Sequence, residues 1–262
     1  MARRIAAAGI PVTVWARRRA VAAAAAQWGA EVAASPAELG ATCDVVGVCV
    51  FDAAGVAEVL FGPQGVTEGM AEGGTVLVHS TVSPSEIQAI ARRADARGIT
   101  VLDAPVSGGP AAADAGELLV LLAGPAAAAE RVLPVVSAYA ARVIRLGDVG
   151  TAQLAKLLNN ALLAAQVALA QDALRLGARH GIGDGLLDVL RTGSARGFAL
   201  DLFAQVGSLD ALASSQFGPT IDKDVRLLAG TLGSRGERSV LMDLAGDLIG
   251  QIAATPKGVT LT

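Results

Sequence analysis

The sequence predicts a doubly wound α/β domain followed by an all-helical domain. Up to about residue 148, short runs rich in β-branched residues alternate with alanine-rich segments of helical length. Such alternation is typical of a mostly parallel sheet covered by helices. After that point apolar residues recur at helical spacing and no further strand is predicted. We therefore expect two domains, at residues 1–148 and 149–262.

Six short segments of the first half are predicted to be strands because they are apolar and rich in valine, leucine or isoleucine. They are Val12–Trp15, Val45–Phe51, Thr75–Ser80, Ile99–Pro105, Leu118–Leu122 and Val143–Leu146. The segment before them, Met1–Gly9, has helical character. A doubly wound nucleotide-binding domain opens with a strand and a Gly-rich turn. We therefore expect that first strand and its loop to be absent from this sequence.

Helical segments lie between the strands and fill the second half of the chain. The start of the helix Pro84–Arg97 is marked by Ser83, Pro84 and Glu86. These residues have the pattern of a capping box with proline at the first helical position. The predicted helices are Ala20–Trp28, Pro84–Arg97, Thr151–Arg179, Leu186–Leu190, Ala199–Val206, Thr220–Leu232 and Glu237–Ile252.

The composition excludes several classes of protein. With 53% hydrophobic and 17% charged residues, the chain is not of the disordered class. A net charge of −3 leaves no basic surface for nucleic acid. Apolar stretches end well before the roughly 18 residues that span a membrane, and no signal peptide is recognisable. We expect a cytoplasmic protein without a nucleic-acid or membrane partner.

The cysteines and histidines offer no metal site. Cys43 and Cys49 flank one predicted strand, too far apart along it to form a disulfide, and we expect both to be reduced core thiols. His79 and His180 are distant in sequence and belong to no ligand motif. We therefore expect no bound metal.

Lysine is scarce in this chain. Of its 21 basic residues only Lys156, Lys223 and Lys257 are lysines. Lysine can exchange a proton near neutral pH when it is buried, whereas arginine cannot. Lys257, in a Pro-Lys-Gly tail, is attributed to chance, and the other two lie in segments with further polar residues.

Three arginines, Arg17, Arg18 and Arg19, directly follow the first predicted strand. In a dinucleotide-binding fold this strand end meets the adenosine ribose, where an acidic residue binds the 2′-hydroxyl and arginine accommodates a 2′-phosphate. Arginines without an acidic residue favour NADP over NAD. The alternative is a solvated helix start.

The segment Asp103–Pro110 leaves a predicted strand at its carboxyl end, where open α/β sheets bind ligands. Gly108 and Gly109 would expose backbone N–H groups beside the Ser107 hydroxyl, which suits a carboxylate or phosphate. The alternative is an ordinary turn.

Two further polar segments contain the remaining lysines. Lys156 and Asn160 are four residues apart, on one helix face that also carries Gln153. Beside an apolar pocket Lys156 could act as general acid or base; the alternative is a surface lysine. Lys223 and Asp224 open or lie early in an apolar helix, and they could also be an exposed ion pair of little energetic weight.

In this order and spacing, these segments resemble the β-hydroxyacid dehydrogenase family, which includes 3-hydroxyisobutyrate dehydrogenase and 6-phosphogluconate dehydrogenase. The resemblance covers nearly the whole chain. It implies a Rossmann-type domain, a helical dimerisation and substrate domain, and NAD(P)-dependent hydride transfer. The substrate would be a small β-hydroxyacid or semialdehyde of the 3-hydroxyisobutyrate, tartronate semialdehyde or glyoxylate type.

The resemblance also implies roles for individual residues. Lys156 would be the catalytic general acid/base. The substrate would be held by Ser107, Gly108, Gly109 and Asn160. The cofactor, NADP with NAD possible, would contact Arg17, Arg18, Val50, Phe51, Thr81 and Lys223.

The sequence departs from the family pattern in several places. The opening strand and the Gly-x-Gly-x-x-Gly loop are absent, and Phe51 replaces a proline. Asn159 stands where the phosphogluconate enzymes have a histidine. The alternative function is therefore a non-catalytic relative whose helical domain serves in assembly. A homodimer or homotetramer is expected in either case.

Overall fold

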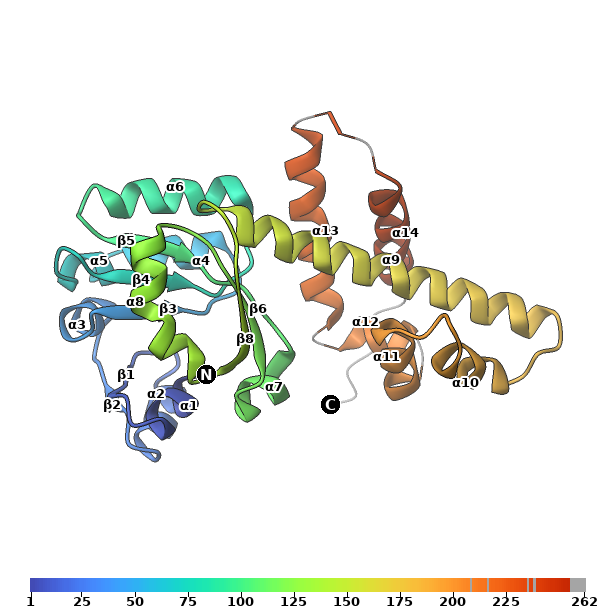
Figure 1. Cartoon of the computed structure of the whole chain (residues 1–262), viewed down its shortest axis with the longest axis horizontal. Coiled ribbons are helices and arrows are strands. Elements are labelled where there is room, and N and C mark those ends of the chain that lie inside the picture. Colours follow the sequence, from blue (N-terminus) through green and yellow to red (C-terminus); the bar gives the residue numbers. More distant parts are fainter. Residues whose placement is uncertain (208, 216, 235, 238, 255–262) are drawn as a thin grey trace. The chain divides into compact units, whose positions relative to one another are not determined.

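The computed structural model describes residues 1–207, 209–215, 217–234, 236–237 and 239–254, so Lys257 lies outside the described residues. The chain divides into two compact units, Met1–Lys156 and Leu157–Thr262 (Figure 1). The first unit combines parallel strands with helices, and the described part of the second is helical. The predicted fold class is confirmed.

The strands of the first unit form three small sheets. In the first sheet, β1 (Thr13–Val14) pairs in parallel with β2 (Glu31–Val32). The second is the parallel sheet β3 (Val45–Val48), β4 (Thr75–Val78) and β5 (Thr100–Asp103). In the third, β7 (Leu118–Leu122) pairs antiparallel with β6 (Val106–Ser107) and in parallel with β8 (Ala140–Arg145).

All six predicted strands are present, and most of them are shorter than predicted. β3 ends at Val48 because the chain turns soon afterwards into α4 (Ala53–Phe61), whose first turn Asp52 caps by accepting a hydrogen bond from the N–H of Gly55 at 2.8 Å. The sequence did not predict β2 and β6, since two residues are too few to produce an alternating apolar pattern.

The core of the first unit lies on both faces of β4, whose four residues are all buried. Side chains that alternate along a strand point to opposite faces. Val76 and Val78 accordingly pack in a cluster with Val56 of α4 and Ile87 of α6 (Pro84–Asp95). Leu77 belongs to a second cluster that includes Val132 of α8 (Ala126–Ser137).

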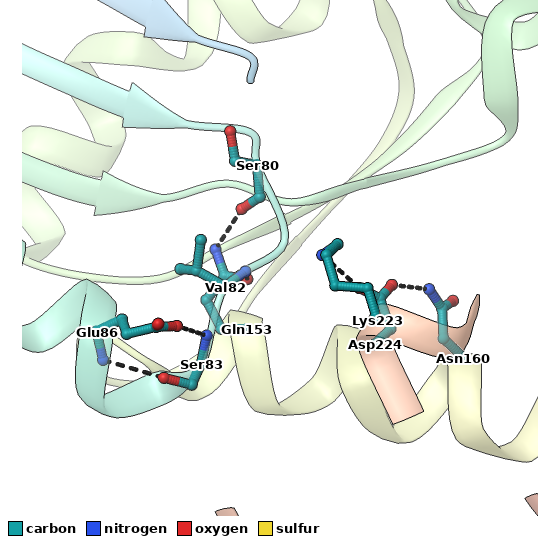
Figure 2. A network of polar contacts seen from close by, with 8 residues as sticks. All are labelled: Ser80, Val82, Ser83, Glu86, Gln153, Asn160, Lys223 and Asp224. Carbon is teal, nitrogen blue, oxygen red and sulfur yellow. Dashed lines mark hydrogen bonds and ion pairs between the residues drawn. The ribbon is translucent and has the colours of Figure 1, made fainter. Parts of the chain in front are cut away.

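The predicted capping box at the start of α6 is confirmed. The Ser83 hydroxyl accepts from the N–H of Glu86, and the Glu86 carboxylate accepts from the N–H of Ser83 (Figure 2). The remaining helices of this unit are α1 (Ala2–Ala7), α2 (Arg19–Ala26), α3 (Pro36–Thr42), α5 (Val66–Gly69) and α7 (Gly109–Ala115).

A cavity of about 660 Å³ lies between β1 and β3, which are not hydrogen-bonded to each other. Both cysteines line it as free thiols. Cys49 is exposed and Cys43 is half-buried, so the prediction of core thiols is wrong. The reason is that β3 stops before Cys49, whose side chain borders the cavity instead of the packed core.

The second unit is built on α9 (Thr151–Arg179), whose predicted bounds are confirmed. The other predicted helices are present with small shifts, and the sequence did not predict the short helix α12. The elements are α10 (Gly185–Thr192), α11 (Phe198–Val206), α12 (Leu209–Ser214), α13 (Phe217–Gly233) and α14 (Val240–Ala254). In the part of this unit that the structure describes there is no strand.

The described residues contain neither a candidate membrane-spanning helix nor a candidate metal-binding cluster. No helix combines the length and the hydropathy needed to cross a membrane. No group of three or more His, Cys, Asp or Glu side chains is arranged to hold a metal ion.

Candidate functional site

The side chain of Gln153 is the centre of a buried polar network in the first unit. Gln153 lies in the first turn of α9 and is fully buried. Its Nε2 donates to the carbonyl oxygen of Ser80 at 3.0 Å, and its Oε1 accepts from the N–H of Val82 at 3.1 Å (Figure 2). The Gln153 amide therefore binds the backbone of the residues before and after Thr81, for which we expect cofactor contact.

Asp103 fixes the beginning of α9 from the carboxyl end of β5. Its two carboxylate oxygens accept from the N–H groups of Gly150 at 3.1 Å and Gln153 at 3.0 Å. Gly150 precedes the helix and has no side chain with which to cap it, and its φ of +102° favours glycine. Asp103 supplies the missing cap. Its complete burial raises the pKa of the carboxyl, and the N–H groups of Gly150 and Gln153 partly oppose this rise.

The predicted cofactor segment Val50–Phe51 is tied to the same loop. The N–H of Val50 donates to the Ser80 hydroxyl at 2.9 Å. Val50 is half-buried, whereas the side chain of Phe51 is exposed. Because β3, β4 and β5 are parallel neighbours, Val50, Ser80 and Asp103 lie at the same edge of the sheet, where open α/β sheets bind ligands.

Lys156 is buried, with only 9% of its surface exposed. It follows Gln153 by three residues, so it lies about one turn further along α9. This burial excludes the alternative of an ordinary surface lysine. Asn160 follows four residues later in the same helix, as the spacing predicts.

The predicted carboxylate-binding residues form a tight turn between β6 and α7. Ser107 ends β6, and the glycines that follow have φ angles of +127° at Gly108 and +71° at Gly109. A Cβ atom on Gly108 would lie 2.6 Å from the Cβ of Ala112, so a side chain there is excluded by space as well as by backbone conformation. Both glycines are exposed, and the turn is accessible to a ligand.

Arg17 and Arg18 lie in the turn between β1 and α2. Together with Ala16 and Val21 they line a surface hollow of about 310 Å³. Arg17 lies 3.8 Å from the Glu58 carboxylate, and both side chains are largely exposed, so this ion pair contributes little to stability. The turn that lines this hollow contains two arginines and no acidic residue.

The described part of the second unit contains a separate buried polar cluster around Asp224. This carboxylate accepts from Asn160 Nδ2 at 2.6 Å and pairs with Lys223 Nζ at 2.6 Å (Figure 2). Asp224 is fully buried and Lys223 mostly so, and the alternative of an exposed ion pair is therefore wrong. The pair does not open its helix but lies early in it, which is one of the two predicted positions. α13 begins at Phe217, which places Lys223 and Asp224 in its second turn.

Comparison with known proteins identifies the family. Residues 1–147 match the family described as the NAD binding domain of 6-phosphogluconate dehydrogenase. The chain belongs to the β-hydroxyacid dehydrogenase family.

Members of this family are similar to the chain in sequence and in structure. An L-threonate dehydrogenase of Cupriavidus necator is 42% identical over 159 residues, which cover 60% of this chain and 54% of that protein. A 3-hydroxyisobutyrate dehydrogenase of Pseudomonas aeruginosa is 36% identical over 59% of this chain and 52% of its own length. The matched region therefore spans about half the length of these curated relatives. The structure of Mycobacterium tuberculosis 3-hydroxyisobutyrate dehydrogenase with L-serine matches with a TM-score of 0.84 and 25% identity, covering 97% of this chain and 89% of that one.

Three residues of this chain make hydrogen bonds within the candidate site that the sequence did not reveal. Gln153 was recognised only as sharing a helix face with Lys156, Asp103 only as the first residue of a motif, and Asp224 only as the neighbour of a lysine. The available signal was a polar side chain at an apolar position: Gln153 and Asp224 interrupt the apolar faces of their helices, and Asp103 ends an apolar strand. A polar residue at such a position is usually hydrogen-bonded, but the sequence does not name its partner.

Proposed function

We propose that this protein is an NAD(P)-dependent oxidoreductase that transfers a hydride between the nicotinamide and a small β-hydroxyacid or its semialdehyde. Substrates of the 3-hydroxyisobutyrate, tartronate semialdehyde and glyoxylate type fit this proposal. The observation that carries it is the buried Lys156, in a helix whose first turn is hydrogen-bonded to the carboxyl ends of β4 and β5.

The residues at this sheet edge fit a dinucleotide. The turn containing Arg17 and Arg18 offers two guanidinium groups to a 2′-phosphate, which supports a preference for NADP, with NAD as the other possible cofactor. We propose that Val50, Phe51 and Thr81 contact the cofactor at the neighbouring strand ends. When bound, the nicotinamide supplies the hydride donor or acceptor.

Lys156 is proposed to move the proton that accompanies hydride transfer. In the direction of reduction its ammonium group gives a proton to the developing alkoxide, and in oxidation its amine removes the proton from the hydroxyl. Because Lys156 is only 9% exposed, its amino group exchanges few protons with bulk water.

Substrate binding is proposed for Ser107, Gly108 and Gly109. Consecutive glycines with positive φ turn backbone N–H groups toward an anion, and the Ser107 hydroxyl adds a further donor for a carboxylate. In the second unit, we propose that Asn160 orients the substrate and that Lys223 contacts the cofactor. The side chains of both are held by Asp224.

A second candidate function is assembly without catalysis. Its structural basis would be a row of exposed leucines on α9, which includes Leu162, Leu169 and Leu176 at seven-residue spacing. We propose that this row contributes to a homodimer or homotetramer, and a homo-oligomer is compatible with catalysis as well.

A substrate screen that follows NADPH absorbance tests the proposal, with Lys156→Ala and Lys156→Arg as variants. Both are expected to lower kcat by about 10²- to 10⁴-fold while leaving the Kd for NADPH nearly unchanged. Lys156→Arg is the sharper variant because it keeps the positive charge, whereas arginine cannot act as an acid or base near neutral pH. Turnover comparable to that of the wild type in either folded variant would contradict the assignment. Absence of NADPH binding by the folded protein would favour the assembly function.

A further inference from the structure

The loop between β4 and α6 is held by a side chain from another element. Ser80, Thr81 and Val82 have no regular secondary structure, and the backbone groups of Ser80 and Val82 are bound by Gln153 of α9. We propose that Gln153 is a positioning residue that fixes this loop to the turn of α9 that leads to Lys156. The catalytic part of the proposal rests on the proposed function, whereas the fixing of the loop can be measured without it.

A glutamine is suited to this position because its amide carries one donor and one acceptor in a single plane. The Ser80 carbonyl needs a donor and the Val82 N–H needs an acceptor, and the two lie two residues apart. Ser80, Val82 and Gln153 are each at most 4% exposed, so water does not replace these bonds readily. Removing the amide would leave two buried backbone groups without this partner, which is costly.

Gln153 also joins two sets of side-chain hydrogen bonds. On one side the Ser80 hydroxyl accepts from the N–H of Val50, in the segment proposed to contact the cofactor. On the other side the Gln153 backbone donates to Asp103, which caps α9. The bonds therefore run from the end of β3, through the loop and the Gln153 side chain, to the helix that carries Lys156.

This connection has a catalytic consequence under the proposed function. The Ser80–Val82 loop is proposed to lie beside the nicotinamide, and Lys156 is proposed to supply the proton. The position of the nicotinamide relative to Lys156 therefore depends on how the loop is fixed to α9. A misplacement of about 1 Å can reduce a rate about 100-fold. Gln153 is proposed to act through the loop and does not need to touch the substrate.

Gln153→Met tests the proposal, because methionine has a similar size and lacks both polar groups. The matched control is Gln88→Met, since Gln88 donates to the carbonyl oxygen of Val149 at 3.1 Å near the start of α9 and makes no hydrogen bond to the loop. We expect amide hydrogen exchange at Val82 to rise about tenfold in Gln153→Met. We also expect kcat to fall about 10- to 100-fold with the Kd for NADPH nearly unchanged. The control should show neither change.

Unaltered amide exchange at Val82 in Gln153→Met would overturn the proposal. If the wild-type protein turns over a substrate, an unchanged kcat in Gln153→Met would overturn it as well. If the wild type turns over no substrate, the proposed function fails and the Val82 exchange rate alone decides whether Gln153 fixes the loop. Should Gln153→Met not fold, Gln153→Asn replaces it. This variant keeps the amide but is one methylene too short to reach both backbone groups, so the same two changes are expected, and wild-type behaviour would overturn the proposal.

Discussion

Asn160 donates through its Nδ2 to Oδ2 of Asp224 over 2.6 Å, and the carboxylate that receives this bond is completely buried. The other oxygen of Asp224 pairs with Lys223. Burying a carboxylate is costly unless charged and polar partners satisfy it, and here both partners are present. The cluster therefore fixes two side chains for which we propose ligand contacts.

Replacing Asp224 with alanine is expected to destabilise the protein. The change leaves the Lys223 ammonium and the Asn160 amide without this acceptor, and breaking such a buried pair costs about 3 kcal/mol. Urea denaturation measures the loss. Asp222→Ala is the matched control on the same helix, because Asp222 pairs with Arg226 at the surface and should change the unfolding free energy little. An equal loss of unfolding free energy in the two variants would show that the Asp224 cluster does not stabilise the protein more than a surface ion pair does.

Local patterns in the sequence were enough to predict many of the elements but not the contacts of the site. The bounds of α9 follow from apolar residues at 154, 157, 158, 161, 162 and 165 and from the glycines that flank the helix. The capping box of α6 is likewise a property of four consecutive residues. Asp103 and Gln153 are 50 residues apart, and Asn160 and Asp224 are 64 apart. No local spacing reports such a pair, so the fold has to bring the partners together before the bond can be recognised.

The arginine turn after β1 is expected to select the cofactor. A double variant, Arg17→Glu with Arg18→Glu, should raise the Kd for NADPH by at least about tenfold, because a charge-assisted hydrogen bond to a phosphate contributes about 1.5–3 kcal/mol. The Kd for NADH should change much less, since NADH has no 2′-phosphate. Fluorescence titration with both cofactors measures the ratio. The double variant Arg92→Glu with Arg142→Glu, at two other exposed arginines, controls for the change in net charge. An equal loss for both cofactors would rule out recognition of the 2′-phosphate.

His79 is expected to make the stability of the protein depend on pH. Its ring is buried, Nδ1 lies 2.7 Å from the carbonyl oxygen of Ala104, and Nε2 lies 3.2 Å from the Tyr139 hydroxyl. Burial lowers the pKa of His79 below its ordinary value of 6.5, and the hydrogen bond to Ala104 opposes this only in part. Between the lowered pKa and 6.5 the unfolded chain binds a proton that the folded chain does not.

The unfolding free energy should therefore be at its full value above pH 6.5 and fall as the pH drops below it, by at most about 1.4 kcal/mol per pH unit for this one group. Urea titrations between pH 7.5 and 5.5 measure the slope. His79→Gln should reduce the slope, whereas His180→Gln, at an exposed histidine, should leave it in place. The same slope in all three proteins would exclude His79 as its source.

The leucines on α9 are expected to determine the oligomeric state. Leu162, Leu169 and Leu176 are 51%, 53% and 46% exposed, and their spacing of seven residues places them in one row along the helix. Exposed apolar side chains at this spacing are typical of a helix that packs against another helix. The double variant Leu162→Glu with Leu169→Glu should convert the proposed homo-oligomer to a monomer, because it would place charges opposite apolar side chains. Light scattering coupled to size-exclusion chromatography measures the mass.

A matched control separates this row from a general effect of exposed apolar residues. Val189 of α10 is 63% exposed and lies outside the row, so Val189→Glu should leave the mass unchanged. If the leucine variant keeps the mass of the wild type, the row does not form the interface. If the variant becomes a monomer and still turns over substrate, the active site is complete within one chain. If activity disappears together with the oligomer while the thermal stability of the chain is retained, a second chain contributes to the site.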